Sequence, residues 1–405
     1  MTRRNILLFV TSLVFLATLS FVDSYSQENV ITIGCAISLS GPLVKEGKLT
    51  KDGYDLWVKL VNDRGGLNVG GKKYKVAIKY YDDESNVQTS TKLIEKLITE
   101  DKLGLLLGPY GSGPSFAASA ISEKYKKVMV IPMAASPDIY ERGFKYIFGV
   151  LATTDEYMVD IIRLAGKQNP KPKAVAMLWK NDLANKSLAK PIPDLCKEIG
   201  AELVYNEKFA PDATDFASEL AVIKGKNPDI LIFFSQLPQF IMAMKQIKEM
   251  KIDAKMITNG IAVPQPDFVK SLGKDAEYVV GPSNWEPSSK YGDDLFKDSL
   301  DYVKKFQEMH GYVPDYHAAG GTAGVLILGK AIEKAGSTDP EKVREALANF
   351  NETTFWGPIK FDNTGKITGR GMVVGQIQGG KFVPVYPEPL AEGKLIWPAP
   401  PWDKR

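Results

Sequence analysis

Residues 103–132 read LGLLLGPYGSGPSFAASAISEKYKKVMVIP, and this stretch decides the fold class. Leu103–Leu107 and Val128–Pro132 are short apolar runs of the length expected for buried strands, and Ser115–Tyr125 between them has helical character. The first run ends in the turn Gly108–Pro114, which leads into the helix. A strand, a helix and a second strand in this order predict a parallel sheet flanked by helices.

The same alternation extends in both directions and then restarts. On the N-terminal side we expect strands at Val30–Ser38 and Lys75–Tyr81 and helices at Asp52–Asp63 and Gln88–Thr99. After a crossover at Gly143–Thr154, the pattern predicts strands at 174–179, 202–209, 230–234 and 256–259 and helices at 186–198, 216–224 and 238–250. Two successive units of this kind predict an α/β protein with two Rossmann-like lobes.

The C-terminal part supplies further helices at Asp294–Met309, Ala318–Ala335 and Asp339–Ala348, and a Gly-rich hairpin over Phe355–Tyr386. We assign residues 27–148 and about 283–353 to the first lobe, and residues 149–282 and about 354–390 to the second. Residues 391–405, which contain several prolines, are expected to form an extended tail.

The N-terminus predicts export. Arg3 and Arg4 precede the apolar run Ile6–Val22, and small residues follow at Asp23–Gln27. This arrangement is typical of a signal peptide, here residues 1–26, and predicts a periplasmic or otherwise extracytoplasmic protein. An uncleaved membrane anchor is the alternative, because the run has about the minimum length for a span.

Composition excludes several function classes. The 405 residues hold 51 Lys and Arg against 48 Asp and Glu, so no basic field favours nucleic acid. Two histidines, His310 and His317, lack metal-ligand spacing, and we expect neither metal nor cofactor. The segment Gly41–Lys48 resembles a phosphate-binding loop but has one residue too many and Leu49 where Ser or Thr belongs. Cys35 and Cys196 are expected to be buried free thiols rather than a disulfide.

Smaller features were also assigned. Asp82-Asp83-Glu84 is expected to be a solvated turn rather than a metal site.

Ligands of open α/β sheets bind beyond the carboxyl ends of the strands. In this chain, hydroxyls, amides and small residues occur at those positions. No nucleophile, base or metal cage stands out among them, so we expect a binding protein rather than an enzyme.

Gly111-Ser112-Gly113 opens a helix after a strand, which suits either an anion site or a plain N-cap. Tyr110, Trp179 and Trp285 are candidate aromatic walls of a ligand cleft, with ordinary core packing as the alternative for each tryptophan.

In these features the chain resembles the type I periplasmic binding proteins of importers for branched-chain amino acids and related solutes. The resemblance extends from about Val30 to Tyr386 and depends on several motifs in register. They are Ile33-Gly34, Ser40-Gly41-Pro42 and Gly47, then Asn62–Leu67, Gly108 with Gly111-Ser112, Pro132 with Ser136-Pro137 and Arg142-Gly143, and Ala335–Pro340.

The resemblance implies two lobes joined by a three-segment hinge, which close over a ligand and present it to the permease of an ABC-type importer. It implies a small-molecule ligand, an ABC transporter permease as partner and a monomer. A sensory ligand-binding module of the same fold, signalling to another protein, is the alternative.

The resemblance also implies roles for single residues. Ser112 matches the hydroxyl that holds the ligand carboxylate in amino-acid-binding relatives, and Met133 and Ala134 match positions whose main chain lines the same site. Three positions depart from the family pattern. Ala135 replaces a threonine, Ala184 a tyrosine, and Asn259 the carboxylate that pairs with the ligand ammonium. Asp182 or Glu286 would have to supply the missing charge for an amino acid to bind.

We therefore expect a small carboxylate or neutral compound without an α-ammonium, including aromatic ones, held between Ser112 and Trp179 or Trp285. The full set of expected ligand-site residues is Ser40, Glu46, Tyr110, Gly111, Ser112, Met133, Ala134, Ala135, Ser136, Trp179, Asp182, Gln236, Asn259 and Trp285.

Overall fold

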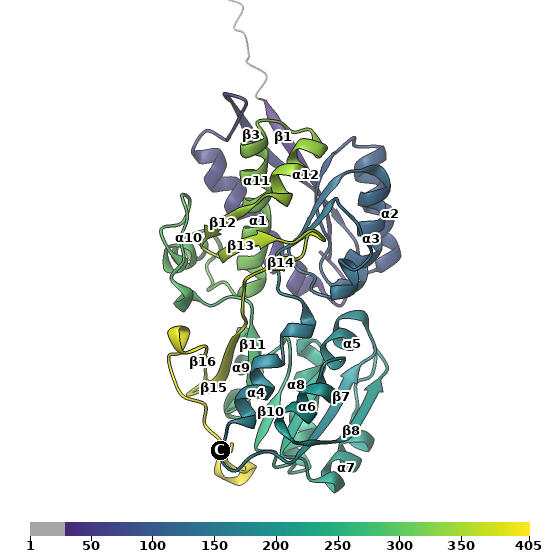
Figure 1. Ribbon diagram of the computed structural model, residues 1–405, viewed down its shortest axis with the longest axis vertical. Coiled ribbons are helices and arrows are strands. Elements are labelled where there is room, and N and C mark those ends of the chain that lie inside the picture. Colours follow the sequence, from purple (N-terminus) through teal and green to yellow (C-terminus); the bar gives the residue numbers. More distant parts are fainter. Residues whose placement is uncertain (1–28) are drawn as a thin grey trace, which may run out of the picture.

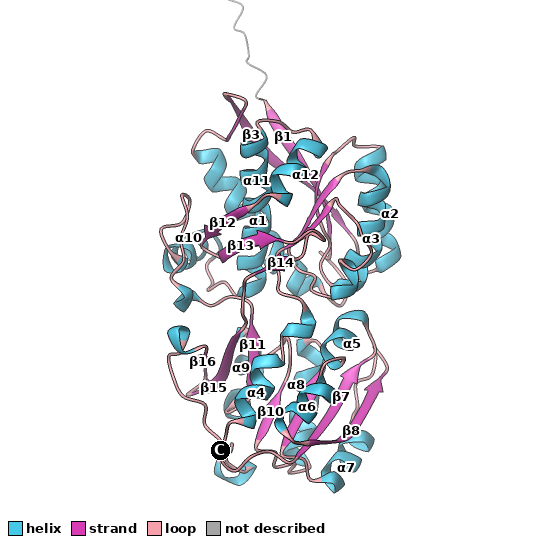
Figure 2. Ribbon diagram, in the orientation of Figure 1, coloured by secondary structure: helices cyan, strands magenta, loops and turns pink. Residues whose placement is uncertain are grey.

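Two α/β lobes lie end to end and are joined by three crossings of the chain (Figure 1). A computed structural model describes residues 29–405, so the expected signal peptide at residues 1–26 lies outside the described residues. Strands form the centre of each lobe and helices cover their faces (Figure 2). The predicted two-lobed α/β fold is confirmed.

The first lobe is built on a six-stranded sheet in the order β2-β3-β1-β4-β5-β6. All neighbours in it are parallel except the pair β2 and β3. Its strands are β1 (Val30–Ile37), β2 (Leu67–Val69), β3 (Lys72–Asp82), β4 (Leu105–Leu107), β5 (Val128–Ile131) and β6 (Ile147–Gly149). Its helices are α1 (Val44–Asp63), α2 (Val87–Thr99), α3 (Ser112–Tyr125), α10 (Ser299–His310), α11 (Tyr316–Ala335) and α12 (Pro340–Ala348).

Strand β4 shows why its apolar run has no alternation. Leu105 and Leu107 pack in a core with α1 and α11, which contribute Trp57 and Leu326. Leu106 points to the other face and packs with residues of α2 and α3. Both faces of a parallel sheet are buried, so each residue of the strand is apolar.

The second lobe has a seven-stranded sheet in the order β16-β15-β11-β10-β9-β7-β8. Its strands are β7 (Ala174–Lys180), β8 (Glu202–Phe209), β9 (Ile230–Phe234), β10 (Met256–Thr258), β11 (Val280–Ser283), β15 (Val373–Gln378) and β16 (Lys381–Tyr386). Its helices are α4 (Val159–Gly166), α5 (Leu183–Ala189), α6 (Ile192–Ile199), α7 (Ala217–Lys226), α8 (Leu237–Glu249) and α9 (Pro266–Leu272).

The boundary expected near residue 353 needs correction. Strands β12 (Asn351–Thr354), β13 (Gly357–Phe361) and β14 (Ile367–Thr368) form a separate antiparallel sheet that belongs to the first lobe. The rings of Phe361 and Phe148 pack together with their centroids 5.3 Å apart, and the Trp356 indole donates a hydrogen bond to the Val150 carbonyl at 3.2 Å. The third crossover therefore lies at residues 369–372, because aromatic packing holds the expected hairpin's first half on the first lobe.

Three smaller expectations also changed. The helix expected from Asp52 begins at Val44, so the segment that resembles a phosphate-binding loop runs into α1. The helix expected at 186–198 is two helices, because Pro191 cannot continue the first one. Asp83 is buried rather than solvated, and it accepts hydrogen bonds from the Ser38 hydroxyl at 2.7 Å and the Ser85 N–H at 2.9 Å.

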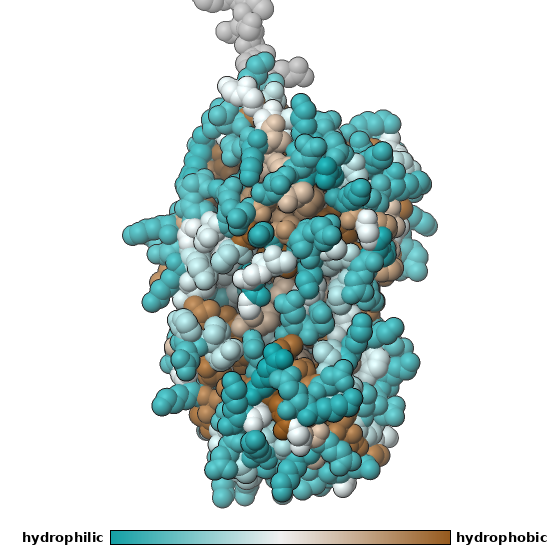
Figure 3. Space-filling view, viewed as in Figure 1, coloured by the Kyte–Doolittle hydropathy of each residue, from teal (hydrophilic) through white to brown (hydrophobic). Residues whose placement is uncertain are grey.

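Other expectations agree with the structure. Cys35 and Cys196 are free and buried, one in each lobe. The tail runs along the second lobe, where the Trp402 indole donates to the Ile252 carbonyl at 2.9 Å. Polar residues cover most of the face seen in Figure 3, with hydrophobic residues showing between them, as in a globular exterior. Among residues 29–405, no helix is both long and apolar enough to cross a membrane.

Candidate ligand-binding site between the lobes

A cavity of about 60 Å³ lies where strand ends of both lobes meet. A buried water needs roughly 10–15 Å³ on this scale, so the space suits a small organic molecule and excludes a peptide. It is lined by Tyr110, Gly111, Ser112, Met133, Ala134, Ala135, Leu151, Thr154, Tyr157, Ala184, Gln236, Ile261 and Tyr316. We call it the interlobe pocket.

The first lobe contributes the start of helix α3. Gly111 precedes the helix with φ +92° and ψ 151°, a backbone conformation open almost only to glycine. The Ser112 oxygen accepts hydrogen bonds from the N–H groups of Ala135 and Ser136, at 3.3 and 3.2 Å. Ser112 therefore joins the loops after β4 and β5 instead of capping its own helix, and its hydroxyl proton is left to donate to a ligand.

The N-terminus of α3 also presents backbone donors. Within the described residues, the N–H groups of Ser112 and Gly113 make no hydrogen bond, as expected for the first turn of a helix. The helix dipole adds a partial positive charge at this end. Together with the Ser112 hydroxyl, these groups favour an anionic oxygen such as a carboxylate.

Three tyrosines, Tyr110, Tyr157 and Tyr316, form much of the pocket wall. Behind Tyr110, its Oη lies 3.3 Å from His317 Nε2, and His317 Nδ1 lies 3.0 Å from Asp315 Oδ2. Burial would raise the pKa of Asp315, but His317 and two backbone N–H groups outweigh it and hold the pKa below its ordinary value. Asp315 is thus a carboxylate held against the His317 ring, which in turn contacts the Tyr110 hydroxyl and fixes this side of the pocket wall.

The second lobe contributes small and amide side chains. Ala184 lies in the first turn of α5, Ile261 follows β10, and Gln236 precedes α8. The Gln236 Oε1 atom is buried and has no hydrogen-bond partner among the described residues. No residue that lines the pocket is charged, so nothing in its wall compensates a ligand ammonium.

The structure brings together half of the expected site residues. Tyr110, Gly111, Ser112, Met133, Ala134, Ala135 and Gln236 line the interlobe pocket. Glu46, in the first turn of α1, is buried near Tyr110 and Tyr316 without lining it. Ser136 lies beside the pocket and bonds across to the second lobe.

The structure does not support the expected ligand-site roles of Trp285 and Asn259. Trp285 is buried among aromatic residues of the first lobe and donates to the Phe355 carbonyl at 3.1 Å, so it does not line the interlobe pocket. The Asn259 amide donates to the carbonyls of Phe233 and Ser235 and accepts the N–H groups of Ile261 and Ala262. Its side chain holds the loop after β10 and has no capacity left for a ligand.

Three further expected residues lie outside the pocket. Trp179 lines an outer groove with Asp138 and Lys186, and its indole donates to Asn206 at 3.1 Å. Asp182 caps α5 by accepting the Asn185 N–H. Ser40 is exposed in a turn, where its N–H donates to Asp82 at 3.1 Å.

Sequence reasoning missed five lining residues: Leu151, Thr154, Tyr157, Ile261 and Tyr316. The first three lie in or beside the first crossover. The sequence predicts this crossover, but the expected ligand-site residues include none from it. A crossover must pass next to a cleft between lobes, so its apolar and hydroxyl residues were an available signal. Nothing in the sequence pattern brings Tyr316, at the start of α11, to the same place.

Contacts between the lobes close the pocket. The hydroxyls of Ser136 and Ser187 lie 2.8 Å apart and both residues are buried. Near the surface, Lys45 of α1 pairs with Asp267 of α9 at 2.7 Å. These contacts join α-helices and loops of different lobes, so they exist only while the lobes are together.

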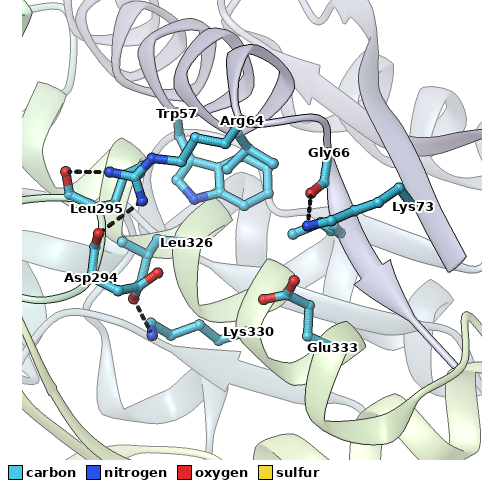
Figure 4. A pocket seen from close by; sticks show the side chains of 11 residues that line it. Trp57, Arg64, Gly66, Lys73, Asp294, Leu295, Leu326, Lys330 and Glu333 are labelled. Atoms are coloured by element: carbon cyan, nitrogen blue, oxygen red, sulfur yellow. Dashed lines mark hydrogen bonds and ion pairs between the residues drawn. The ribbon is translucent and has the colours of Figure 1, made fainter. Parts of the chain in front are cut away.

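Another cavity, of about 130 Å³, lies within the first lobe (Figure 4). Its charged groups are partnered: Arg64 donates to the carbonyls of Asp294 and Leu295, and Lys330 pairs with the Asp294 carboxylate at 2.6 Å. Lys73 donates to the Gly66 carbonyl at 3.1 Å. These bonds tie α1 and α11 to the loop before α10, which is a structural role.

The family model for periplasmic binding proteins matches residues 30–381. The chain belongs to the periplasmic binding protein family. A Pseudomonas aeruginosa protein named leucine-, isoleucine-, valine-, threonine- and alanine-binding protein is 25% identical over 350 residues, which cover 85% of this chain and 89% of the relative.

Solved structures of the same fold include two informative ones. The branched-chain amino acid transporter substrate binding protein LivJ from Streptococcus pneumoniae, in complex with isoleucine, superposes with a TM-score of 0.78 at 21% identity, covering 87% of this chain and 98% of LivJ. A solute binding protein of an ABC transporter from Rhodopseudomonas palustris, in complex with 3,4-dihydroxybenzoic acid, has a TM-score of 0.76 at 22% identity, covering 88% and 95%.

Proposed function

We propose that this periplasmic binding protein captures a small organic carboxylate without an α-ammonium and delivers it to an ABC-type importer. The observation that carries the proposal is the charge of the interlobe pocket: a helix N-terminus and Ser112 favour an anion, and no lining residue is acidic. The three tyrosines replace Trp179 and Trp285 as the expected aromatic surfaces.

The comparisons support a ligand with a carboxylate. The relative from P. aeruginosa is named for amino acids, and the R. palustris protein binds an aromatic acid. Both ligand classes share a carboxylate and differ in the ammonium. An amino acid ammonium placed in this pocket would lose its hydration without contacting a counter-charge in the lining, which costs free energy. We therefore infer the ligand class of aliphatic or aromatic acids, captured without chemical change.

Export and the importer partner complete the proposal. The N-terminal sequence favours an extracytoplasmic location, and S. pneumoniae LivJ is by its name a transporter's substrate binding protein. Hinge closure would then bury the solute between the lobes and present one closed surface to the permease.

The test is calorimetric titration of the chain without residues 1–26 with a matched pair of ligands. L-Leucine and 4-methylpentanoate share a carbon skeleton and a carboxylate, and only leucine has an ammonium. We expect 4-methylpentanoate to bind at least about 10-fold more tightly than leucine, which corresponds to a difference of about 1.4 kcal/mol in binding free energy. Leucine binding with equal or higher affinity would overturn the proposed ligand class.

A second arm changes the pocket instead of the ligand. Gln236→Glu adds a carboxylate at nearly constant shape, at an atom that has no partner to lose. The variant should shift the preference toward leucine, because the new charge compensates the ammonium. An unchanged preference would show that Gln236 does not face the bound solute.

A further inference from the structure

A second cavity between the lobes, of about 170 Å³, shares no lining residue with the interlobe pocket. It lies along the second and third crossovers. Its lining comprises Asn284, Trp285, Glu286, Ser289, Tyr291, Trp356, Gly357, Pro358, Gly369, Arg370, Gly371, Met372, Val373, Pro387 and Leu390. We call it the hinge cavity, because both lobes and two of the three crossovers form its wall.

Arg370 is a cation in this wall without a counter-charge. Its guanidinium carbon lies 4.5 Å from the centroid of the Trp356 ring, and Nη2 donates to the Asn284 carbonyl. Nη1 is buried and has no hydrogen-bond partner among the described residues. Burial lowers the pKa of Arg370 to about 9, which still leaves it charged at neutral pH. A half-buried cation with a buried, unsatisfied donor is costly, and an anion in the cavity would remove that cost.

The carboxylic acid of the same wall does not neutralise Arg370. Burial raises the pKa of Glu286 to about 8, and repulsion from Asp315 and Glu392 adds to this. Glu286 is therefore mostly protonated at pH 7 and can donate a hydrogen bond instead of repelling an anion. With Tyr291 and Trp356 as aromatic walls, the cavity offers a guanidinium, a neutral carboxyl group and flat apolar surface.

One residue connects this cavity with the interlobe pocket. The Asn284 amide donates to the Tyr157 hydroxyl at 2.7 Å, and its Oδ1 accepts the Ala152 N–H at 3.2 Å. Its carbonyl accepts from Arg370. Asn284, in the second crossover, thus ties the first crossover to the third, and Tyr157 lines the interlobe pocket.

We propose that the hinge cavity is a second binding site, which takes a small organic carboxylate on Arg370 and is coupled to the interlobe pocket through Asn284. Residues of both lobes contact the occupant, so its affinity depends on the hinge angle. By linkage, the occupant of the hinge cavity changes the affinity of the interlobe pocket for its solute by a certain factor. The solute changes the affinity of the hinge cavity for its occupant by the same factor.

The test measures the number of 4-fluorobenzoate molecules bound per chain, by equilibrium dialysis with fluorine NMR detection. Arg370→Gln removes the cation. Gly371→Leu adds a bulky side chain at the cavity lining without removing any group, since a Cβ at Gly371 meets no atom within 4 Å. Both variants should lose one bound 4-fluorobenzoate or bind it at least about 10-fold more weakly. Arg163→Gln, which removes a half-exposed arginine paired with Glu198, is the control and should not change binding.

The outcomes separate this site from the proposed function. Loss of binding in Ser112→Ala but not in Arg370→Gln or Gly371→Leu assigns 4-fluorobenzoate to the interlobe pocket alone and overturns the hinge site. Equal binding in all variants, including no binding in any, overturns it too. Circular dichroism and thermal unfolding check that Arg370→Gln folds, and Gly371→Leu remains decisive if it does not.

Discussion

Ser112 uses one hydroxyl for two purposes. Its oxygen accepts the N–H groups of Ala135 and Ser136, which positions the loop after β5, and its own hydrogen is left to donate to a ligand in the interlobe pocket. Resemblance to the family pointed to this residue, while composition and spacing left an N-cap equally open. The capping alternative is excluded by hydrogen bonds to a loop 23 residues further along the chain.

Ser112→Ala should weaken binding of 4-methylpentanoate by roughly 10- to 100-fold, because a charge-assisted hydrogen bond contributes about 1.5–3 kcal/mol. Calorimetric titration measures this effect. Ser40→Ala is the matched control, since Ser40 is exposed in a turn outside the pocket. Unchanged affinity in Ser112→Ala would remove the hydroxyl from the ligand's partners.

Single residues were the hardest to predict from the sequence. Trp285 and Asn259 both follow strands at the ligand edge of a sheet, where the pattern predicts site residues. Trp285 packs against Tyr302 and Phe355, and the Asn259 amide donates to the carbonyls of Phe233 and Ser235, so both positions depend on segments far away in the sequence. Local pattern contains no information on such contacts.

At the scale of elements, the turn before α3 determines whether the pocket exists. Gly111 takes a conformation with φ +92°, and its N–H donates to the Met133 carbonyl at 2.9 Å. This aims the first turn of α3 at the cleft. Gly113, two residues later, lies inside the helix, and a Cβ there would make an ordinary contact with Val87 at 3.8 Å.

Gly111→Ala should therefore lower the free energy of unfolding by about 1–3 kcal/mol, the cost of forcing a side chain into this conformation. It should also weaken 4-methylpentanoate binding, because the helix N-terminus shifts. Gly113→Ala should do neither. Urea unfolding and calorimetry measure both effects, and equal behaviour of the two variants would contradict the role given to Gly111.

Elements as such were largely predictable. The segments Glu202–Phe209 and Ile230–Phe234 form strands with the predicted bounds. Errors arose where tertiary contacts decide: the aromatic packing of Trp356 and Phe361 keeps residues 351–368 on the first lobe, and the first turn of α1 lies close against Ser38 at Gly47. Two prolines within Lys186–Glu198 were a visible signal for the break that was missed.

At the scale of the whole molecule, the two lobes are in contact across the pocket. The buried Ser136–Ser187 hydrogen bond and the exposed Lys45–Asp267 pair cannot form when the hinge opens. The buried bond is worth more, since exposed ion pairs contribute only about 0–1 kcal/mol. In the proposed closure, these contacts add affinity although the ligand does not touch them.

Ser187→Ala removes such a contact. We expect 4-methylpentanoate affinity to fall about 2- to 10-fold, from a hydrogen bond worth about 0.5–1.5 kcal/mol. In X-ray scattering the ligand-free variant should have a larger radius of gyration than the wild type, with equal values at saturation. Ser90→Ala, buried within the first lobe, is the control. Identical scattering and affinity would show that the lobes do not open about this contact.

The ligand class is tested most directly by mass spectrometry of the solute that co-purifies with the exported protein and is released by denaturation. A pocket with a helix N-terminus, a serine hydroxyl and no acidic residue predicts a small aliphatic or aromatic carboxylate without an amine, at close to one molecule per chain. Recovery of leucine, isoleucine, valine or another α-amino acid in that amount would contradict the account.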